Sequence, residues 1–286
     1  MVELQVPEVD YTRYSNRQLA SVPLAVLTLA LLVIAGWYVT TGAPVSPGTE
    51  FTGGTEMRIQ TDTPQSQIDA QFDAEVTSVT ATQSGTNTYI VEFQSTNTDA
   101  LRAQANQAGF EILSLQSTSA SFGSDSQRLA LYGLGAAFLG MSLLVFAMFR
   151  TFVPSVAVVV SAFSDIVIPV ALMNVLGIKL SLGTVAALLM LIGYSVDSDI
   201  LLNNHILRRS GGFYESTYRA MRTGVTMTLT SISAMAVMTL VAAFYGIDLL
   251  TAIGVVLVMG LATDLMNTYM LNLSLLRWYK YEGVAR

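Results

Sequence analysis

The sequence predicts a polytopic α-helical membrane protein with six transmembrane helices and one α+β ferredoxin-like domain, which is inserted between the first and second helices. Three observations favour this fold class. Of the 286 residues, only 12% are charged and 52% are hydrophobic, and the mean hydropathy is +0.53, whereas soluble domains carry about 25% charged residues. The apolar residues gather in six long runs. A single long polar segment, residues 42–127, separates the first run from the others.

Each apolar run is long enough to cross about 30 Å of hydrocarbon at 1.5 Å per residue. The runs cover roughly residues 22–40, 129–149, 152–176, 180–206, 225–245 and 249–276. The expected organisation is an N-terminal segment 1–21, a first helix 22–40, an inserted domain 41–127, a five-helix bundle 128–276 with a loop at about 207–224, and a tail 277–286.

The positions of the basic residues predict the orientation of the chain. With the N-terminus in the cytoplasm, ten of the 14 Lys and Arg residues lie inside, and four lie outside: Arg58, Arg102, Arg128 and Lys179. We therefore expect a multi-pass protein of the cell membrane with both termini cytoplasmic and residues 41–127 extracytoplasmic.

The inserted segment shows the pattern β-α-β-β-α-β. Residues 55–60 alternate as a half-buried strand does, and Ile68 and Phe72 mark a short helix. Residues 75–83 and 88–94 indicate two strands joined as a hairpin across 84–87. A second helix around Leu101 and Ala105 precedes a strand at 111–115. This order is that of the ferredoxin-like split arrangement.

Composition excludes several functional classes. The net charge of −6 argues against a nucleic-acid partner, because phosphate binding requires a concentrated basic surface. With no cysteine and only His205, thiolate and polyhistidine metal sites are not expected. The sequence shows no phosphate-binding loop and no nucleophile–base pair, so neither a cofactor nor enzymatic activity is predicted.

Four acids fall inside the predicted helices: Asp165, Asp197, Asp199 and Asp264. A charged, unpaired carboxylate at the bilayer centre costs about 2.5 to 3.5 kcal/mol on insertion scales, so such residues are functional candidates by default. For Asp165 and Asp264, a structural hydrogen bond and a role in proton passage are both open. Asp264 and Asn267 form an expected i,i+3 polar pair.

Asp197 and Asp199 cannot face the same pathway, because positions two apart on a helix point about 200° apart. Asp197 shares its face with Asn204, and Asp199 shares the opposite face with Asn203. The pattern favours Asp197 as the ion-coupling residue, with Asp199 bonding a neighbouring helix.

Two short motifs carry a family resemblance. Phe51-Thr52-Gly53-Gly54-Thr55 opens the inserted domain, and Gly193-Tyr194-Ser195-Val196-Asp197 lies in the fourth predicted helix. In this topology the chain resembles the SecF family of the SecD/SecF protein-export complex. The resemblance implies half of a resistance-nodulation-division (RND) fold, a SecD partner and association with the Sec translocon and translocating preprotein. It also implies that the transmembrane ion gradient assists late export, with the proton expected as the ion and Na⁺ as the alternative.

The sequence departs from the bacterial family pattern at two places. Bacterial sequences tend to read Gly-Tyr-Ser-x-Asn-Asp, which would set the carboxylate at Ser198, whereas here the acids flank that position. The bacterial arginine of the fifth helix aligns with Thr226, and Arg222 lies one helical turn earlier. With the acidic composition, these departures suggest an archaeal, salt-adapted member.

Two other functions compete with this hypothesis. A small-molecule efflux transporter could use half of the same fold, although the single small insert is less than its usual paired external domains. A scaffold that stabilises a translocon without transport would tolerate neutralisation of all four acids, since buried charge is usually a cost.

Overall fold

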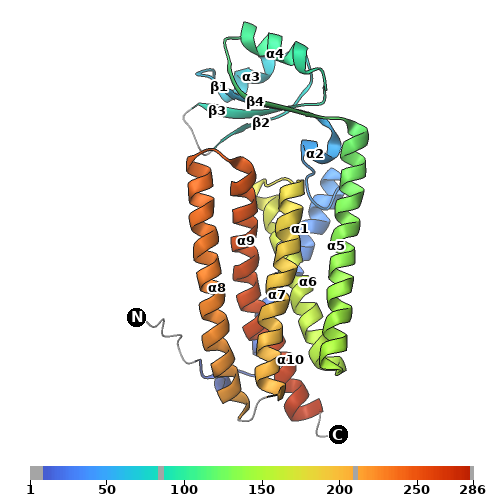
Figure 1. Ribbon diagram of the computed structural model, residues 1–286, viewed down its shortest axis with the longest axis vertical. Coiled ribbons are helices and arrows are strands. Elements are labelled where there is room, and N and C mark those ends of the chain that lie inside the picture. The colour runs from blue at the N-terminus through green and yellow to red at the C-terminus, as the bar shows by residue number, and fades with distance from the viewer. Residues whose placement is uncertain (1–8, 83–86, 209–211, 284–286) are drawn as a thin grey trace.

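In the part of the chain that the structure describes, six long apolar helices run side by side and confirm the polytopic helical fold (Figure 1). The structure, a computed structural model, describes residues 9–82, 87–208 and 212–283. The first five spans are α1 (Asn16–Thr41), α5 (Ala120–Phe149), α6 (Phe152–Leu176), α7 (Leu182–Arg208) and α8 (Phe213–Phe244). The sixth span is composite and comprises α9 (Asp248–Met266), the π-helical η3 (Asn267–Asn272), α10 (Leu273–Trp278) and the π-helical η4 (Tyr279–Gly283).

Local sequence explains where the first of these helices begins and ends. Ser15 accepts a hydrogen bond from the Gln18 amide, and the Gln18 side chain bonds back to the Ser15 amide, which forms a capping box. Gly42 ends the helix in the left-handed conformation with φ of 78°, which glycine adopts without a Cβ clash. The boundaries of this helix therefore follow from the polar residues and the glycine that flank the apolar run.

A four-stranded antiparallel sheet stands at one end of the bundle. Its strands are β1 (Gly54–Gln60), β2 (Val76–Ala81), β3 (Thr88–Phe93) and β4 (Glu111–Thr118), in the order β2-β3-β1-β4. The short helices α3 (Gln65–Ile68) and η2 (Asp69–Gln71) and the longer α4 (Thr98–Gln107) connect the strands. This order confirms the ferredoxin-like arrangement. Residues 83–86, the expected hairpin turn, lie outside the described residues.

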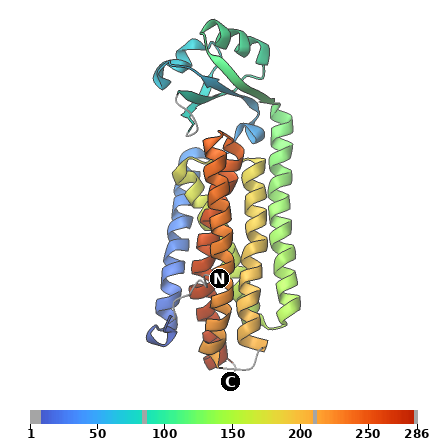
Figure 2. The same ribbon diagram turned by 60° about the vertical axis from the view of Figure 1, so that its left-hand side comes forward.

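The two faces of the sheet differ in chemistry. Met57 and Ile59 of β1 are fully buried with Leu101 of α4 and form the domain core. The alternate residues of β1, Glu56 and Arg58, lie on the opposite face, as the period of two requires. The sheet lies between α4 and the helix bundle, so this polar face is directed toward the bundle (Figures 1 and 2).

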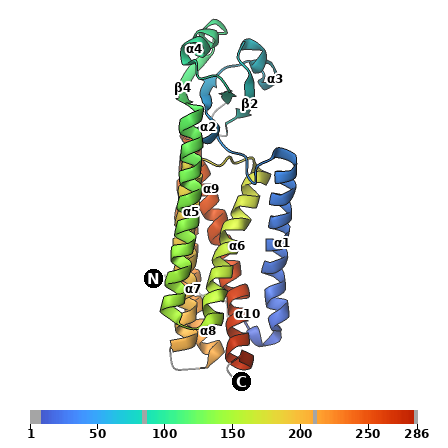
Figure 3. The same ribbon diagram turned by 90° about the vertical axis from the view of Figure 1, so that its right-hand side faces the viewer.

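The helices of the bundle are unequally buried. α7 packs against α5, α6, α8 and α9. Over the most apolar stretch, 56% of the residues in α6 and in α7 are buried, against 6% in α5 and 11% in α8. α1 and α5 lie on opposite sides of the bundle (Figure 3). The outer helices therefore present apolar surfaces that lipid or further helices would cover.

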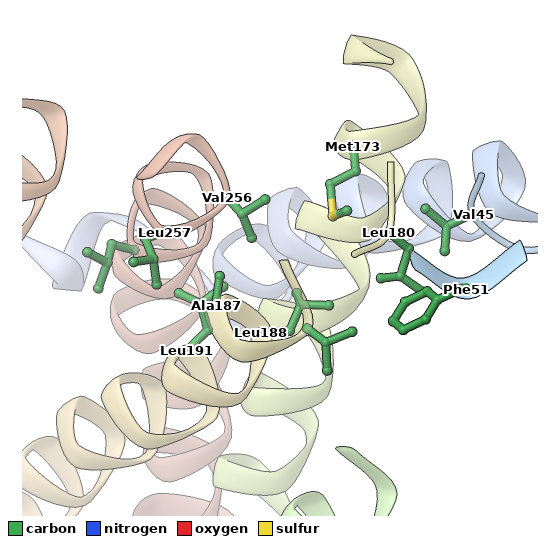
Figure 4. Close-up of a cluster of buried hydrophobic side chains, with 11 residues drawn as sticks. Val45, Phe51, Met173, Leu180, Ala187, Leu188, Leu191, Val256 and Leu257 are labelled. Carbon is green, nitrogen blue, oxygen red and sulfur yellow. The ribbon is translucent and has the colours of Figure 1, made fainter. Parts of the chain in front are cut away.

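An apolar cluster joins the inserted domain to the bundle (Figure 4). Val45 and Phe51, from the segment that enters the domain, belong to the same cluster as Met173 near the end of α6 and Leu180 in the loop before α7. The cluster continues between α7 and α9 through Leu188, Leu191 and Leu257. Each Å² of apolar surface buried in this cluster contributes about 25 cal/mol. The cluster therefore holds the segment that enters the inserted domain against the ends of the helices.

The first and last described segments meet at the end of the bundle opposite the sheet. Arg277 donates a hydrogen bond of 3.0 Å to the Tyr11 carbonyl. Several residues of the charge analysis, namely Arg209, Arg286 and the side chain of Arg208, lie outside the described residues. The membrane orientation stays a prediction.

Candidate functional site

Three of the four intramembrane acids converge in the interior of the bundle. Asp165 of α6, Asp199 of α7 and Asp264 of α9 are 1%, 0% and 2% exposed. Their partners are hydroxyl and amide groups of neighbouring helices. We call these three acids, with the side chains that bond them, the carboxylate cluster.

Asp165 has two strong donors from two different helices. The Ser195 hydroxyl donates to Oδ2 at 2.6 Å, and the Asn267 amide donates to Oδ1 at 2.6 Å. Ser195 belongs to the Gly-Tyr-Ser motif, so this motif contributes a hydrogen bond between α7 and α6. The Asp165 carboxylate is therefore satisfied at both oxygens.

Asp199 and Asp264 are bridged by one hydroxyl. Thr268 Oγ1 lies 2.9 Å from Asp199 Oδ1 and 3.2 Å from Asp264 Oδ1. Both Oδ1 atoms also accept from a second donor at 2.7 Å. The Asn272 amide donates to Asp199 Oδ1, and the Ser198 hydroxyl donates to Asp264 Oδ1. Ser198 stands where the bacterial pattern has an acid, and here its hydroxyl donates to the acid Asp264.

The cluster contains acceptors that lack partners. Asp199 Oδ2 and the amide oxygens of Asn203, Asn267 and Asn272 are buried and have no hydrogen-bond partner among the described residues. None of the ion pairs found between described residues includes the three acids. Buried polar groups are normally satisfied, and unsatisfied ones call for a functional explanation. The unpartnered oxygens of the carboxylate cluster would favour the binding of a proton or of a metal cation.

The π-helical segment η3 determines which side chains reach the cluster. Asn267, Thr268 and Asn272 all belong to it and are fully buried. The expected pairing of Asp264 with Asn267 is wrong, because the Asn267 amide bonds Asp165 on α6 and Asp264 is bonded by Thr268. π-helical turns are frequent at functional sites, because they redirect side chains from the regular helical register.

The structure places three other candidates away from the cluster. Asp197 is exposed on the side of α7 opposite to Asp199, and Asn204 is half-buried with an unpartnered amide oxygen among the described residues. Arg222 is exposed on α8, and its carbonyl accepts a bond from Thr226. Gly193 and Tyr194 also lie on the exposed side of α7. The preference for Asp197 over Asp199 as the coupling residue has no support in this burial pattern.

The first family motif forms the joint of the inserted domain. Phe51 is buried in the apolar cluster beneath the sheet. Gly53 and Gly54 have φ of 76° and 117°. A Cβ at Gly53 would overlap the backbone of Ala120 at the start of α5, and one at Gly54 would overlap the Phe93 carbonyl. Only glycine fits these positions, so the motif has a structural role.

Two ion pairs join the polar face of the sheet to the helix ends. Lys179, in the loop between α6 and α7, pairs with Glu92 of β3 and donates to Ser78 of β2. Arg58 of β1 pairs with Asp248 at the start of α9, at 3.1 Å. We call these contacts the junction. They bind the sheet to the loop that precedes α7 and to the first turn of α9, and these two helices carry Asp199 and Asp264.

The junction holds an unfavourable arrangement within the sheet. Glu56 of β1 lies directly opposite Glu92 of β3, and like charges in such positions are destabilising. Burial chiefly raises the pKa of Glu56, and the negative charges of Glu92, Asp248 and Glu50 raise it further, while Lys179 acts in the opposite direction. Lys179 therefore compensates a charge conflict that the sheet alone would retain.

Sequence reasoning missed several of these residues. Thr268 and Asn272 continue the series Asp264, Thr268, Asn272 at intervals of four, which places three polar side chains on one face of the last span. That spacing was a usable signal. The partners of Lys179 and Arg58 had no local signal, because each pair joins segments far apart in the sequence.

Comparison with known proteins shows what the chain is similar to. The family model described as protein export membrane protein SecD/SecF, C-terminal, matches residues 98–282. The protein-export membrane proteins SecF of the archaeal halophiles Haloferax volcanii and Haloquadratum walsbyi are 71% and 68% identical to it, over all of both chains. That of Pyrococcus furiosus is 38% identical and covers 91% of this chain and 90% of its own.

A solved structure shows the same fold at low sequence identity. SecDF from Thermus thermophilus, described as a translocon-associated membrane protein, matches with a TM-score of 0.70 and 18% identity. The match covers 96% of this chain but 39% of the solved chain, so this chain spans about two fifths of that longer protein. The likeness shows that this chain and the matched part of the solved chain share one fold. From the family model and the relatives together, the chain belongs to the SecF branch of the SecD/SecF protein-export membrane proteins.

Proposed function

We propose that this chain is an accessory subunit of the Sec translocase, which uses the transmembrane ion gradient, with a SecD-type partner, to assist late steps of preprotein export. It is not an enzyme in this proposal, and it requires no cofactor. The observation that carries the proposal is the carboxylate cluster, in which three acids are buried in an apolar bundle without a cation among their bonded partners.

The energy available is sufficient for such a role. One charge that crosses 100 mV releases about 2.3 kcal/mol, and intramembrane acids typically mark proton relays. A structural purpose alone would be served by neutral side chains of the same size, since burying unpaired charge is costly. The cluster therefore supports a coupling role in which Asp199, Asp264 and Asp165 change protonation during the cycle.

The junction supports a path from the cluster to the inserted domain. A change in the packing of α7 against α9 moves the two helix ends to which the sheet is bound by Lys179 and Arg58. The Leu182 amide in the first turn of α7 donates a hydrogen bond of 2.7 Å to Glu50 Oε2. In our proposal this movement shifts the domain, which holds or releases the emerging polypeptide.

The exposed face of α7 supports a second membrane subunit. Asp197 projects from an apolar helix without a bonded partner in the described structure, and such a residue needs a polar partner or a wet cavity. The solved SecDF chain extends well beyond the match. We propose that a SecD-type chain covers this face, with both termini of the present chain in the cytoplasm and the inserted domain outside, near the translocon.

Secretion of a Sec-dependent reporter tests the proposal. Asp199→Asn in the chromosomal copy should remove the uncoupler-sensitive part of export, while the membrane abundance of the protein stays normal. Asp125→Asn is the matched control, because Asp125 is an exposed acid on the span α5. Undiminished, uncoupler-sensitive export in both Asp197→Asn and Asp199→Asn would contradict ion coupling through α7.

A further inference from the structure

We infer that Asp199 and Asp264 hold a single proton between them, and that the Thr268 hydroxyl passes this proton from one carboxylate to the other. The inference deepens the proposed function, because it names the ion and the relay residue of the same site. It depends on the three oxygens Asp264 Oδ1, Thr268 Oγ1 and Asp199 Oδ1, which form a continuous chain through the interior of the bundle.

The hydroxyl protons available leave the contact between Thr268 and Asp264 without a proton. Each hydroxyl carries one proton and can donate only once. The Ser198 proton lies on its shortest carboxylate contact, 2.7 Å to Asp264, and the Thr268 proton on the 2.9 Å contact to Asp199. Thr268 Oγ1 also lies 3.2 Å from Asp264 Oδ1 and 3.2 Å from Ser198 Oγ, and in this assignment neither contact has a proton between its two oxygens. A proton on Asp264 converts the contact between Thr268 and Asp264 into a hydrogen bond.

The charges of Asp199 and Asp264 also indicate that the pair holds one proton. If both acids were ionised, two negative charges would be bridged by one hydroxyl in a buried site with no cation among the bonded partners. Two carboxylates sharing a site do not ionise together, and one retains its proton. If both carboxyl groups were protonated, neither would carry a negative charge. The Thr268, Asn272 and Ser198 donors would then bond to neutral groups. One proton suits all the donors present.

The two ends of the chain are nearly equivalent, which allows the proton to move. Apart from Thr268, Asp199 Oδ1 accepts from Asn272 and Asp264 Oδ1 accepts from Ser198, both at 2.7 Å. In the transfer, the O–H bond of the Asp264 carboxyl breaks as Thr268 Oγ1 gains that proton. The proton that Thr268 held forms a new O–H bond to Asp199. Asp264 becomes the carboxylate, Asp199 becomes the acid, and Thr268 is regenerated.

Asp165 lies outside this exchange but within its electrostatic field. Its oxygens are already bonded by Ser195 and Asn267, and no hydroxyl connects it to the other two acids among the described residues. Thr268 reaches the pair because it lies one turn after Asp264 and within η3. Its role is that of a positioning and relay residue, and another hydroxyl at this site should replace it.

Infrared spectroscopy of the full-length protein in vesicles, co-purified with its SecD-type partner, tests the shared proton. At neutral pH, the double variant Asp199→Asn with Asp264→Asn should lose the carboxyl-band intensity of one protonated carboxyl relative to wild type. Loss of intensity for two carboxyls, or no loss, would overturn the inference. Asp165→Asn is introduced into both proteins that are compared, so that Asp165 contributes to neither spectrum.

A set of threonine variants tests the relay. Thr268→Val removes the hydroxyl at similar volume and should shift the carboxyl band to the position of an unshared acid, whereas Thr268→Ser should keep the wild-type band. Thr263→Val is the matched control, because Thr263 lies on the same span and its hydroxyl donates to the Met259 carbonyl rather than to a carboxylate. A Thr268→Val spectrum equal to the wild-type spectrum would overturn the relay.

Export measurements separate this inference from the proposed function. Thr268→Val should lower uncoupler-sensitive export about tenfold or more, since positioned proton transfer contributes about 10²–10⁴-fold, and Thr268→Ser should restore most of it. Normal export in Asp199→Asn together with the expected spectra would uphold the shared proton and contradict the proposed coupling. Spectra that differ from those expected, together with loss of export in Asp199→Asn, would contradict the shared proton and uphold the proposed coupling.

Discussion

Two groups of acids in this molecule are stabilised in opposite ways. At the junction, Glu92 and Asp248 face the cations Lys179 and Arg58. In the carboxylate cluster, the acids face hydroxyls and amides, and none of the ion pairs between described residues includes them. Charge pairing holds a fixed contact between parts, whereas neutral donors leave a carboxylate free to gain a proton. We therefore propose that the first group attaches the inserted domain and that the second group binds a proton.

Neutralising the cluster should have the largest effect on function. The triple variant Asp165→Asn, Asp199→Asn, Asp264→Asn keeps side-chain volume and should lower export about tenfold or more, by removing proton transfer. The thermal midpoint of the purified protein should stay the same or rise, since buried charge is costly. Retained export would instead favour the scaffold function.

Breaking the junction should mainly affect stability. Lys179→Ala leaves Glu92 opposite Glu56 without a cation, and losing one partner of a buried pair costs about 3 to 5 kcal/mol. Because the Lys179 side chain is 32% exposed, solvent screening lowers the expected loss to about 2 kcal/mol. Amide hydrogen exchange in β2 and β3 measures it.

Two further variants serve as its controls. Glu92→Gln added to Lys179→Ala should recover most of the loss, because the like-charge pair is removed. Arg102→Ala, an exposed cation of α4, should change exchange little. If Arg102→Ala and Lys179→Ala have equal effects, the junction is not a specific attachment.

A smaller effect is expected at Arg58. Arg58→Gln loses the ion pair with Asp248 and a bond to the Gly246 carbonyl. Because Asp248 is 42% exposed, we expect a loss of about 1 kcal/mol, measured as denaturant stability of the domain contact. The effect should shrink in high salt, which screens exposed pairs, and a salt-independent loss would contradict the pairing.

The sequence predicted the six spans, the succession of strands and helices in the inserted domain and the opposed faces of Asp197 and Asp199, because these depend on local periodicity. It did not predict that Asn267 bonds Asp165, because η3 shifts the helical register at that point. The junction could not be predicted either. Lys179 and Glu92 are 87 residues apart, and only the folded arrangement brings them together.

The smallest effect concerns pH and Glu56. The pKa of Glu56 is raised above its ordinary value of 4.5 by burial and by neighbouring carboxylates. The folded state therefore binds this proton more tightly than the unfolded state, and the free energy of unfolding should fall as the pH rises from 4.5 through the raised pKa. Glu56→Gln should flatten this part of the pH profile, as measured by thermal unfolding. An unchanged slope would contradict it.

Proton flux across vesicles is the most direct test of the account. The full chain would be reconstituted with its SecD-type partner, and acidification driven by a membrane potential would be followed with an enclosed pH-sensitive dye. The account predicts flux in wild type and in Asp125→Asn, and its loss in Asp199→Asn and Asp264→Asn. Flux at the wild-type rate in both of the latter variants would contradict the claim that the carboxylate cluster carries the proton.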